Sequence, residues 1–473
     1  MVNVVDSGAK HAPQEMEQFL PGDGTNKYKI QPRKSDAEQA MSNDDFDPFA
    51  MRDNEHPTTD SETLTHLLKA SLGTGILGMP IAFMYSGLVL GIFATIFTAF
   101  ICTHCSYVLV KCGHKLYYRT RRTKMTFAEI AEAAFLKGPK SLRMFAPVAK
   151  FSILFGLFLT YFGTCAVYTV IVAKNFEQVL EHWFGFDIDS RMLIGILLVP
   201  LILIAWVPNL KYLAPVSMVA NVFMGLGLGI TFYYLCQDLP PIQERSLFTL
   251  GTLPSFFSIT IFAMEAIGVV MPLENNMKTP KSFLGVCGVL SKGMSGVTLI
   301  YIVLGFLGYQ RYGDATGQSI TLNLPVEEWP AQAVKVLIAL AVYCTFGLQF
   351  YVCLEIVWDG IKEKCTKRPL LVNYVLRTVL VTAAVVLAVS VPTIAPFMGL
   401  IGAFCFSILG LIFPVIIELI VHWDTGFGAY NWILWKNILI TFCGIGALVF
   451  GSLSAVKDII AEYSGPTGPP EAQ

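Results

Sequence analysis

Glu265 stands in the middle of an otherwise apolar run, between Ile261 and Met271. A carboxylate near the centre of a bilayer is costly, so an intramembrane Glu is a functional candidate by default. It could pair with the ammonium group of a ligand. It could carry a proton, because burial raises the pKa of a carboxyl group. It could instead form an ion pair with a Lys or His of a neighbouring helix.

Gly73-Thr74-Gly75 interrupts the first long apolar segment of the chain, which continues to Pro80. Two glycines beside a threonine weaken a helix and permit non-helical backbone angles. A break here exposes amide N–H groups at the positive end of the following half-helix, which suits a carboxylate. The alternative is close packing of two helices through small residues.

A second interruption stands at the matching place of the sixth apolar segment, where Gly268 follows Glu265. Two broken helices in corresponding halves are typical of the binding site of a secondary transporter. Their freed backbone groups cannot face lipid and must line a cavity or be buried in protein. The residues predicted to hold a small zwitterion are Ser71, Gly73, Thr74, Gly75, Phe262, Ala263, Met264, Glu265, Gly268, Thr345 and Phe346.

His66 and Lys69 precede the first break by less than two helical turns and share one helix face. Histidine titrates near physiological pH, so His66, like Glu265, is a candidate for proton coupling. The alternative is a buried histidine with a neutral hydrogen bond. In the eighth apolar segment, Thr345 and Gln349 are one turn apart and could face the cavity. Phe262 and Phe346 could cover a substrate or simply pack.

These residues need a membrane-spanning scaffold, and the composition predicts one. The chain has 473 residues, of which 54% are hydrophobic and only 14% charged. The apolar runs are about 20 residues long, as in helices that cross a bilayer. A transmembrane β-barrel would show shorter, alternating segments. We predict an all-α polytopic membrane protein with eleven spans, at residues 63–85, 87–110, 147–172, 191–207, 212–236, 253–273, 286–309, 331–357, 373–391, 394–421 and 433–456.

The distribution of charges predicts the domains and the orientation. Residues 1–61 are expected to be a disordered cytosolic tail, 62–457 the transmembrane domain and 458–473 a short extracellular or lumenal tail. Lys and Arg gather in the loops after spans 2, 6 and 8, so these loops are predicted to be cytosolic. This bias also explains the basic cluster at 111–124, and no nucleic-acid partner is expected. Eleven spans then place the C-terminus on the other side of the membrane.

Other classes of site are not indicated. Most of the 11 Cys lie in apolar segments or predicted cytosolic loops, which favours small buried hydrophobes over disulfides. We find no phosphate-binding loop, zinc-ligand spacing or nucleophile motif, so we expect neither an enzyme nor a cofactor or metal. Apart from the lipid bilayer, the expected partners are a small-molecule substrate and a coupling ion. No protein partner can be read from the sequence.

Five motifs resemble the amino acid/auxin permease family and, within it, the proton-coupled amino acid transporters. They are the segments 66–80, 265–278, 308–313, 322–325 and 347–352. The resemblance covers about residues 62–456. It implies a LeuT-like five-plus-five inverted repeat with broken helices 1 and 6 and an eleventh helix. It also implies H⁺-coupled symport of small neutral amino acids. By this resemblance His66 is associated with proton coupling, residues 73–75 would bind the carboxylate, and carbonyls around 263–265 would bind the ammonium.

The sequence departs from the family pattern beside both breaks. Ala70-Ser71 stands where the family often has Gly-Asn, and Met264-Glu265-Ala266 stands where it usually has Phe-Glu-Gly. Two other functions stay open on these residues. One is an amino acid sensor that transports little. The other is a Na⁺-coupled carrier of the same superfamily, in which Ser71 and Thr345 would donate oxygens to the ion. The plasma membrane and the lysosomal or endosomal membrane are both compatible locations.

Overall fold

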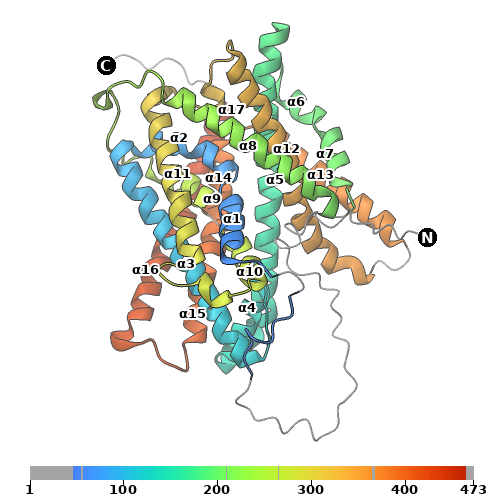
Figure 1. Ribbon diagram of the computed structural model, residues 1–473, viewed down its shortest axis with the longest axis vertical. Helices are drawn as coiled ribbons and strands as arrows, with labels where there is room; N and C mark the ends of the chain where they lie inside the picture. Colours follow the sequence, from blue (N-terminus) through green and yellow to red (C-terminus); the bar gives the residue numbers. More distant parts are fainter. Residues whose placement is uncertain (1–45, 55–56, 209, 265, 365–367, 465–473) are drawn as a thin grey trace, which may run out of the picture.

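The protein is a bundle of long helices in the computed structural model, which describes residues 46–54, 57–208, 210–264, 266–364 and 368–464 (Figure 1). Within these residues the regular structure is helical, and Thr58 forms an isolated β-bridge with Met277. The predicted all-α class is therefore confirmed. The principal α-helices of the first half are α1 (Asp60–Ser71), α2 (Met79–Ser86), α3 (Leu88–Thr120), α4 (Phe127–Lys137), α5 (Ala146–Phe184), α6 (Ser190–Ile196), α7 (Leu198–Ala205) and α8 (Leu210–Leu235).

The second half begins with a helix pair that is interrupted like the first. Its helices are α9 (Leu253–Met264), α10 (Ile267–Asn276), α11 (Val289–Tyr312), α12 (Trp329–Ile361), α13 (Pro369–Ser390), α14 (Ala395–Ile401), α15 (Phe413–Val421), α16 (Trp432–Gly446) and α17 (Ser452–Ser464). Between α1 and α2 runs the short 3₁₀ helix η2 (Thr74–Gly78). Two π-helical segments, η9 (Gly402–Ile412) and η11 (Ala447–Gly451), interrupt the last two spans.

The predicted number of eleven spans is not confirmed. Among the described residues, nine helical stretches are long and apolar enough to cross a membrane, or ten when the bent pair 60–71 and 74–86 is one span. The predicted fourth span, 191–207, corresponds to the shorter apolar stretch Ser190–Ala205. A straight helix of this length is about 24 Å long, which is less than the roughly 30 Å of a bilayer core.

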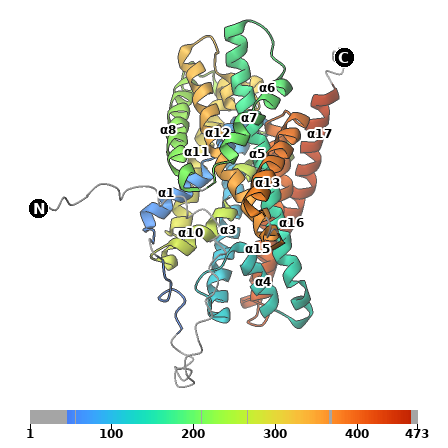
Figure 2. The ribbon, with the colours of Figure 1, turned by 90° about the vertical axis from the view of Figure 1, so that its right-hand side faces the viewer.

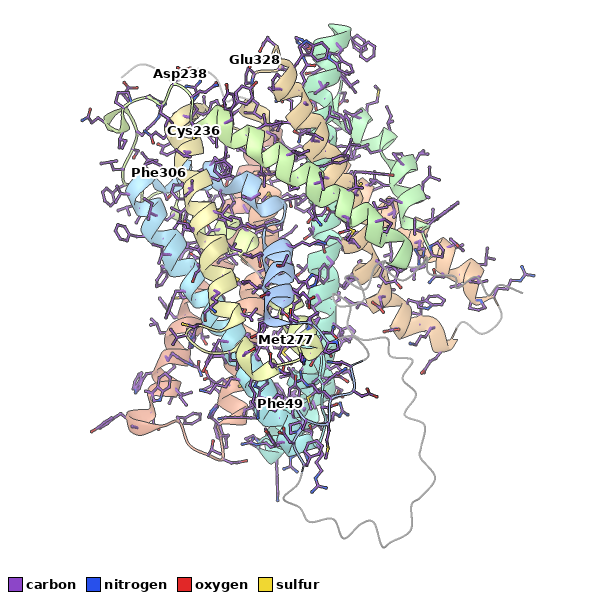
Figure 3. The ribbon with its side chains drawn as sticks, in the orientation of Figure 1. Phe49, Cys236, Asp238, Met277, Phe306 and Glu328 are labelled. Carbon is purple, nitrogen blue, oxygen red and sulfur yellow. The ribbon has the colours of Figure 1, made fainter. Side chains whose placement is uncertain are left out.

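The loops after the fifth and seventh predicted spans lie at the opposite end of the bundle from those after the second and sixth, as the charge pattern predicts. The loops after the fifth and seventh predicted spans meet at one end, where the guanidinium of Arg245 donates to the carbonyl of Gln310 at 3.0 Å. Figure 3 shows Asp238 and Glu328 at this end, and Phe49 and Met277 at the other. At that other end Tyr117, which follows the second span, donates to Glu274, which ends the sixth.

The region before residue 62 is partly structured. Residues 46–54 lie against α3 and the end of α10, and α1 begins at Asp60 rather than at 62. There are two reasons, one local and one tertiary. Thr59 and Glu62 form a capping box that starts α1, and Arg52 finds an acidic partner on α10. Residues 1–45 of the expected tail, and 465–473 of the C-terminal one, lie outside the described residues.

Helix α9 is packed closely on both π-helical segments. A Cβ atom added at Gly402 of η9 would lie 2.1 Å from the carbonyl oxygen of Ser258, and one at Gly451 would lie 2.3 Å from the Ser258 hydroxyl. Glycine is therefore required at both contacts. Figure 2 shows α5, α13 and α16 running along the bundle, with α4 near the end opposite α17. The core of this bundle positions the two broken helices.

Candidate substrate-binding site

The first predicted break is present between α1 and η2. Helix α1 ends at Ser71, and Gly73 adopts an extended conformation with φ −81° and ψ −159°. The helix then restarts at Thr74, and its first bond runs from the N–H of Ile76 to the carbonyl of Gly73 at 3.3 Å. The new helix therefore does not use the N–H groups of Thr74 and Gly75, which are available to an acceptor.

The second predicted break is present between α9 and α10. Helix α9 ends at Met264, and α10 begins at Ile267. Between them, Ala266 has the non-helical angles φ −121° and ψ 7°. Its carbonyl accepts the N–H of Val269 at 3.0 Å, which starts the new helix. Glu265 lies outside the described residues, so the three readings of its carboxylate stay open.

The two breaks lie against each other in the centre of the bundle. A Cβ atom added at Gly75 would lie 2.6 Å from the Cα atom of Ala263, a distance that only glycine permits. Tyr301 of α11 holds both breaks, because its buried hydroxyl is within hydrogen-bonding distance of the carbonyls of Ser71 and Ala263. A hydroxyl has one proton, so the two carbonyls share it. Tyr301 therefore fixes the spacing of the two breaks.

A cavity of about 100 Å³ lies between the breaks and α5. It is lined by Ala70, Ser71, Gly73, Thr74, Gly75, Leu157, Thr160, Tyr161, Thr164, Tyr168, Phe262, Ala263, Ala266, Gly268, Val269, Gln349 and Phe406. We call it the central cavity. None of its described lining residues carries a charged side chain. Its polar groups are hydroxyls, one amide and the peptide groups of the breaks, which suit a neutral or zwitterionic ligand.

A second cavity, of about 160 Å³, adjoins the first and leads toward α8. It is lined by Lys69 at the end of α1, by Ser217 and Asn221 of α8, and by Thr345 of α12. The walls common to both cavities are Ala70, Gly73, Thr74, Tyr161, Tyr168, Val269 and Gln349. We call the second one the adjoining cavity. Lys69 precedes the first break and Val269 follows the second, so this cavity lies on the side of the predicted cytosolic half-helices.

The wall between the cavities is a small polar cluster. The amide of Gln349 donates to the hydroxyl of Tyr168 at 3.4 Å, and the side chain of Thr74 also interacts with that hydroxyl. Tyr161 is the other tyrosine of this wall. Its hydroxyl lies 2.6 Å from the position that a Cβ atom at Gly268 would take. A side chain at position 268 would therefore collide with the tyrosine.

The structure brings most of the predicted substrate residues together. The central cavity is lined by seven of them: Ser71, Gly73, Thr74, Gly75, Phe262, Ala263 and Gly268. Thr345 lines only the adjoining cavity. Met264 and Phe346 are fully buried and line neither cavity. Phe346 instead stacks on Phe350, with ring centroids 6.0 Å apart.

The predicted proton-coupling residues lie outside the lining of both cavities or outside the described residues. His66 is 6% exposed in α1, more than one turn before the break. It shares its helix with Lys69, which lines the adjoining cavity. The described residues contain no group of three or more His, Cys, Asp or Glu side chains placed to hold a metal ion.

The sequence did not predict five lining residues of α5: the apolar Leu157 and the polar Thr160, Tyr161, Thr164 and Tyr168. Their spacing of four and seven residues puts polar side chains on one face of an apolar helix, which is a usable signal. Both threonine hydroxyls donate to a carbonyl one turn earlier in α5, at 2.8 Å. Phe406 comes from η9, and no spacing in the sequence indicates a π-helix there.

The sequence is similar to known proteins along almost its whole length. The family described as "Transmembrane amino acid transporter protein" matches residues 56–457. The chain is 83% identical over 464 residues to "Proton-coupled amino acid transporter-like protein pathetic" of Drosophila melanogaster, and the match covers 98% of each chain. It is 24% identical over 425 residues to "Amino acid transporter ANT1" of Arabidopsis thaliana, covering 85% of this chain and 93% of the plant protein.

Among solved structures, the fold is similar to that of Mhp1, a nucleobase-cation-symport-1 family transporter, in a closed conformation with bromovinylhydantoin bound. The TM-score is 0.50 at 13% sequence identity, and the match covers 89% of this chain and 98% of Mhp1. At this identity the likeness concerns the fold alone. It agrees with the predicted LeuT-like architecture.

Proposed function

Because this chain belongs to the transmembrane amino acid transporter family, we propose that it carries small neutral amino acids across a membrane by symport with protons. It is a multi-pass membrane protein and an amino acid transporter, not an enzyme. The observation that carries the finer proposal is the central cavity. It is small, lacks charged side chains among its described residues, and is bounded by the peptide groups of two broken helices.

The size of the central cavity supports a small substrate. A volume of about 100 Å³ is small for a ligand site, since ligand pockets usually have roughly 300–1,000 Å³. An amino acid of the size of glycine or alanine matches this volume, and a large aromatic one would require its walls to separate. Tyr161, Phe262 and Phe406 form bulky walls around it. A neutral side chain is favoured because no described lining residue offers an opposite charge.

The peptide groups at the breaks are suited to the two charged ends of an amino acid. In our proposal the carboxylate accepts from the N–H groups of Thr74 and Gly75, where the dipole of the restarted helix favours a negative charge. The ammonium donates to carbonyls at the end of α9, around Ala263, with Glu265 next in the chain. Gly73 leaves room at the first break, because a Cβ atom there would have its nearest neighbour at 3.9 Å, and Ser71 and Gly268 also line the cavity.

Proton coupling is supported by the Drosophila relative, which is named as a proton-coupled amino acid transporter-like protein and is 83% identical to this chain. In our proposal His66 or Glu265 carries the proton. Protonation and substrate binding then favour the same conformation, and each shifts the equilibrium by its difference in affinity for the two states. We also propose that the end containing Tyr117 and Glu274 faces the cytosol, because the Lys- and Arg-rich loops lie there.

The proposal is tested with the purified chain in proteoliposomes that have an acidic exterior and a neutral interior. We expect accumulation of labelled glycine, alanine or proline, loss of accumulation with a protonophore, and no change when choline replaces Na⁺. Labelled glutamate, lysine and tryptophan should not accumulate. Binding without accumulation would support a sensor instead, and dependence on Na⁺ would support the ion-coupled alternative.

A further inference from the structure

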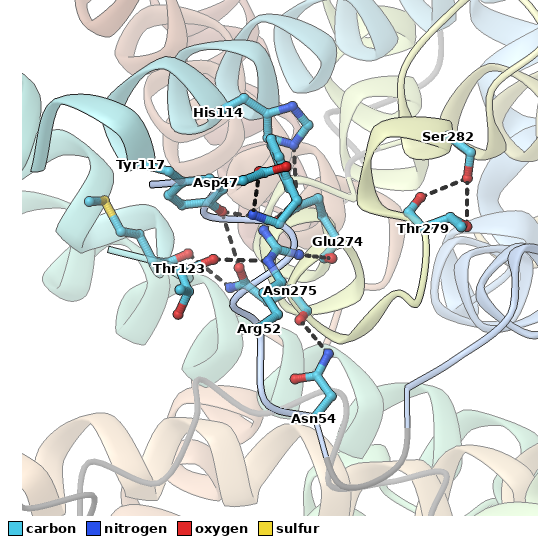
Figure 4. A network of polar contacts seen from close by, with 12 residues as sticks. Asp47, Arg52, Asn54, His114, Tyr117, Thr123, Glu274, Asn275, Thr279 and Ser282 are labelled. Carbon is cyan, nitrogen blue, oxygen red and sulfur yellow. Dashed lines mark hydrogen bonds and ion pairs between the residues drawn. The ribbon is translucent and has the colours of Figure 1, made fainter. Parts of the chain in front are cut away.

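A buried carboxylate lies at the last turn of α10, away from both cavities. Glu274 is fully buried, and three side chains from elsewhere in the chain converge on it (Figure 4). Arg52 contacts its Oε1 at 2.8 Å, and the Nε2 atom of His114 lies 2.9 Å from the same oxygen. The hydroxyl of Tyr117 donates to Oε2 at 3.0 Å. Both oxygens of Glu274 therefore have hydrogen-bond partners, and Arg52 balances its charge.

The side chain of Arg52 is itself buried and makes three hydrogen bonds. Its side chain is 3% exposed, although it comes from a segment that precedes the first membrane helix. Its Nε donates to the carbonyl of Thr123 at 2.9 Å, and its Nη1 donates to the carbonyl of Glu274 at 2.9 Å. The guanidinium also lies 5.3 Å from the ring centres of Phe49 and Tyr117. One side chain thus joins the end of α10 to the loop after α3.

The residues that follow Arg52 continue this attachment. The amide of Asn54 donates to the carbonyl of Asn275 at 3.3 Å. Thr58 accepts the N–H of Lys278 and donates its own N–H to Asn276, each at 2.8 Å. We call residues 46–54 and 57–58 the N-terminal strap. The strap lies directly along the end of α10.

Residues 57–58 of the strap lead directly into α1, so the strap is attached to both broken helices. The carboxylate of Asp60, the first residue of α1, accepts from the hydroxyls of Thr279 at 2.6 Å and Ser282 at 2.7 Å. These two residues follow α10 in the chain. The predicted cytosolic ends of α1 and α10 are therefore fastened to each other and, through Arg52 and Glu274, to α3.

We propose that Glu274 and Arg52 are positioning residues for transport, which hold the α10 half of the substrate cavity in place from its cytosolic end. This inference rests on the proposed function. Helix α10 supplies Gly268 and Val269 to the central cavity, less than two turns from Glu274. A buried ion pair is seldom the most stable filling of a core, and this one joins α10 to a segment that precedes α1. The strap is then a part of the transport machinery.

The test uses the full chain in lipid nanodiscs and proteoliposomes. The variants are Arg52→Ala, Arg52→Lys and Glu274→Gln. The matched control is Arg122→Ala, which removes a cation from the same loop region. Among the described residues Arg122 forms an ion pair with Glu129 at 3.5 Å, in which both side chains are partly exposed. A second matched pair is a deletion of residues 1–45, which keeps the strap, and a deletion of 1–54, which removes most of it. Hydrogen exchange of residues 267–278 and the KM and maximal rate of uptake are measured.

We expect Arg52→Ala and the deletion of 1–54 to speed hydrogen exchange in 267–278 and to raise KM by about fivefold or more. The maximal rate should change less. Arg52→Lys should be intermediate, because an ammonium group cannot reproduce the forked contacts of the guanidinium. Arg122→Ala and the deletion of 1–45 should behave as the full chain. If Glu274→Gln fails to fold, the Arg52 variants still decide the outcome, since Glu274 keeps two partners in them.

Equal exchange and equal KM in Arg52→Ala and Arg122→Ala would overturn the inference, even if the chain transports amino acids. Faster exchange in Arg52→Ala, in a chain that transports none, would support the attachment of α10 by the strap and overturn the proposed function. The exchange measurement needs no transport, so the two failures are distinguishable.

Discussion

Replacing Gly268 by alanine should damage transport because of one identifiable collision. The added Cβ atom would lie 2.6 Å from the hydroxyl oxygen of Tyr161. Non-bonded heavy atoms rest at about 3.5 Å or more, so the tyrosine or α10 must move by roughly 1 Å. Overpacking of this kind costs about 1–3 kcal/mol, which corresponds to a loss of roughly 5- to 150-fold in an equilibrium or a rate.

The same geometry predicts the compensating change. Without the hydroxyl, the nearest atom of the ring would be Cζ, at 3.5 Å from the added Cβ, and Leu157 would be at 3.7 Å. Both are ordinary contacts. The double variant Gly268→Ala/Tyr161→Phe should therefore transport better than Gly268→Ala alone. The interaction free energy of the double-mutant cycle should be about 1 kcal/mol or more, since the two positions touch.

The assay is initial-rate uptake of labelled alanine in proteoliposomes at a fixed pH gradient, with thermal unfolding of each variant measured in parallel. Gly225→Ala on α8 is the matched control, because a Cβ atom there meets no atom within 4 Å. It should transport as the unchanged chain does. Full activity of Gly268→Ala, or strictly additive effects of the two substitutions, would refute the reasoning.

Three further predictions follow from the same site. Gly75→Ala should lower uptake and the unfolding temperature, because its Cβ would lie 2.6 Å from Cα of Ala263; unchanged values in both assays would contradict this. Tyr301→Phe should destabilise the protein by about 1–3 kcal/mol in thermal unfolding, because it removes the donor to the carbonyls of Ser71 and Ala263, and an unchanged transition would show that the bridge is dispensable. His66→Ala should abolish the stimulation of uptake by external acid in a folded protein; full pH-dependent uptake would remove His66 from the mechanism.

The two breaks could be predicted because the signals for them are local. The pair of glycines around Thr74 weakens the first helix within a few residues, and Gly268 does the same in the second long apolar run, where the nearby Glu265 draws attention to the site. Because the two halves of such a chain form an inverted repeat, the two breaks are then expected to lie next to each other. The close contact of Gly75 with Ala263 agrees with this expectation.

The partners of the breaks could not be predicted in the same way. Tyr301 and Phe406 reach the centre from helices far away in the chain, and their positions depend on how the bundle packs. The π-helical geometry of η9 decides where Phe406 lies, and helix propensity does not encode it. Met264 and Phe346 illustrate the converse. Both are predicted site residues, yet their side chains are fully buried and line neither cavity.

The region before α1 shows how composition can mislead. Residues 1–61, taken together, are polar and contain few β-branched side chains, which is typical of disorder, although the part at 46–54 includes Phe46, Phe49 and Met51. The buried contacts of Arg52 and the ring of Phe49 against His114, with centroids 4.9 Å apart, are tertiary features. The contacts of Arg52 depend on Glu274, a carboxylate more than 200 residues away in the chain.

The central claim is that two interrupted helices supply their peptide groups to one substrate cavity. A cryo-electron microscopy structure of the full chain in nanodiscs, with saturating alanine and without it, tests this most directly. We predict ligand density between residues 73–75 and the end of α9 at Ala263, with both helices interrupted. Continuous helix through residues 71–76 and 262–268, or alanine bound at a different place, would contradict the account.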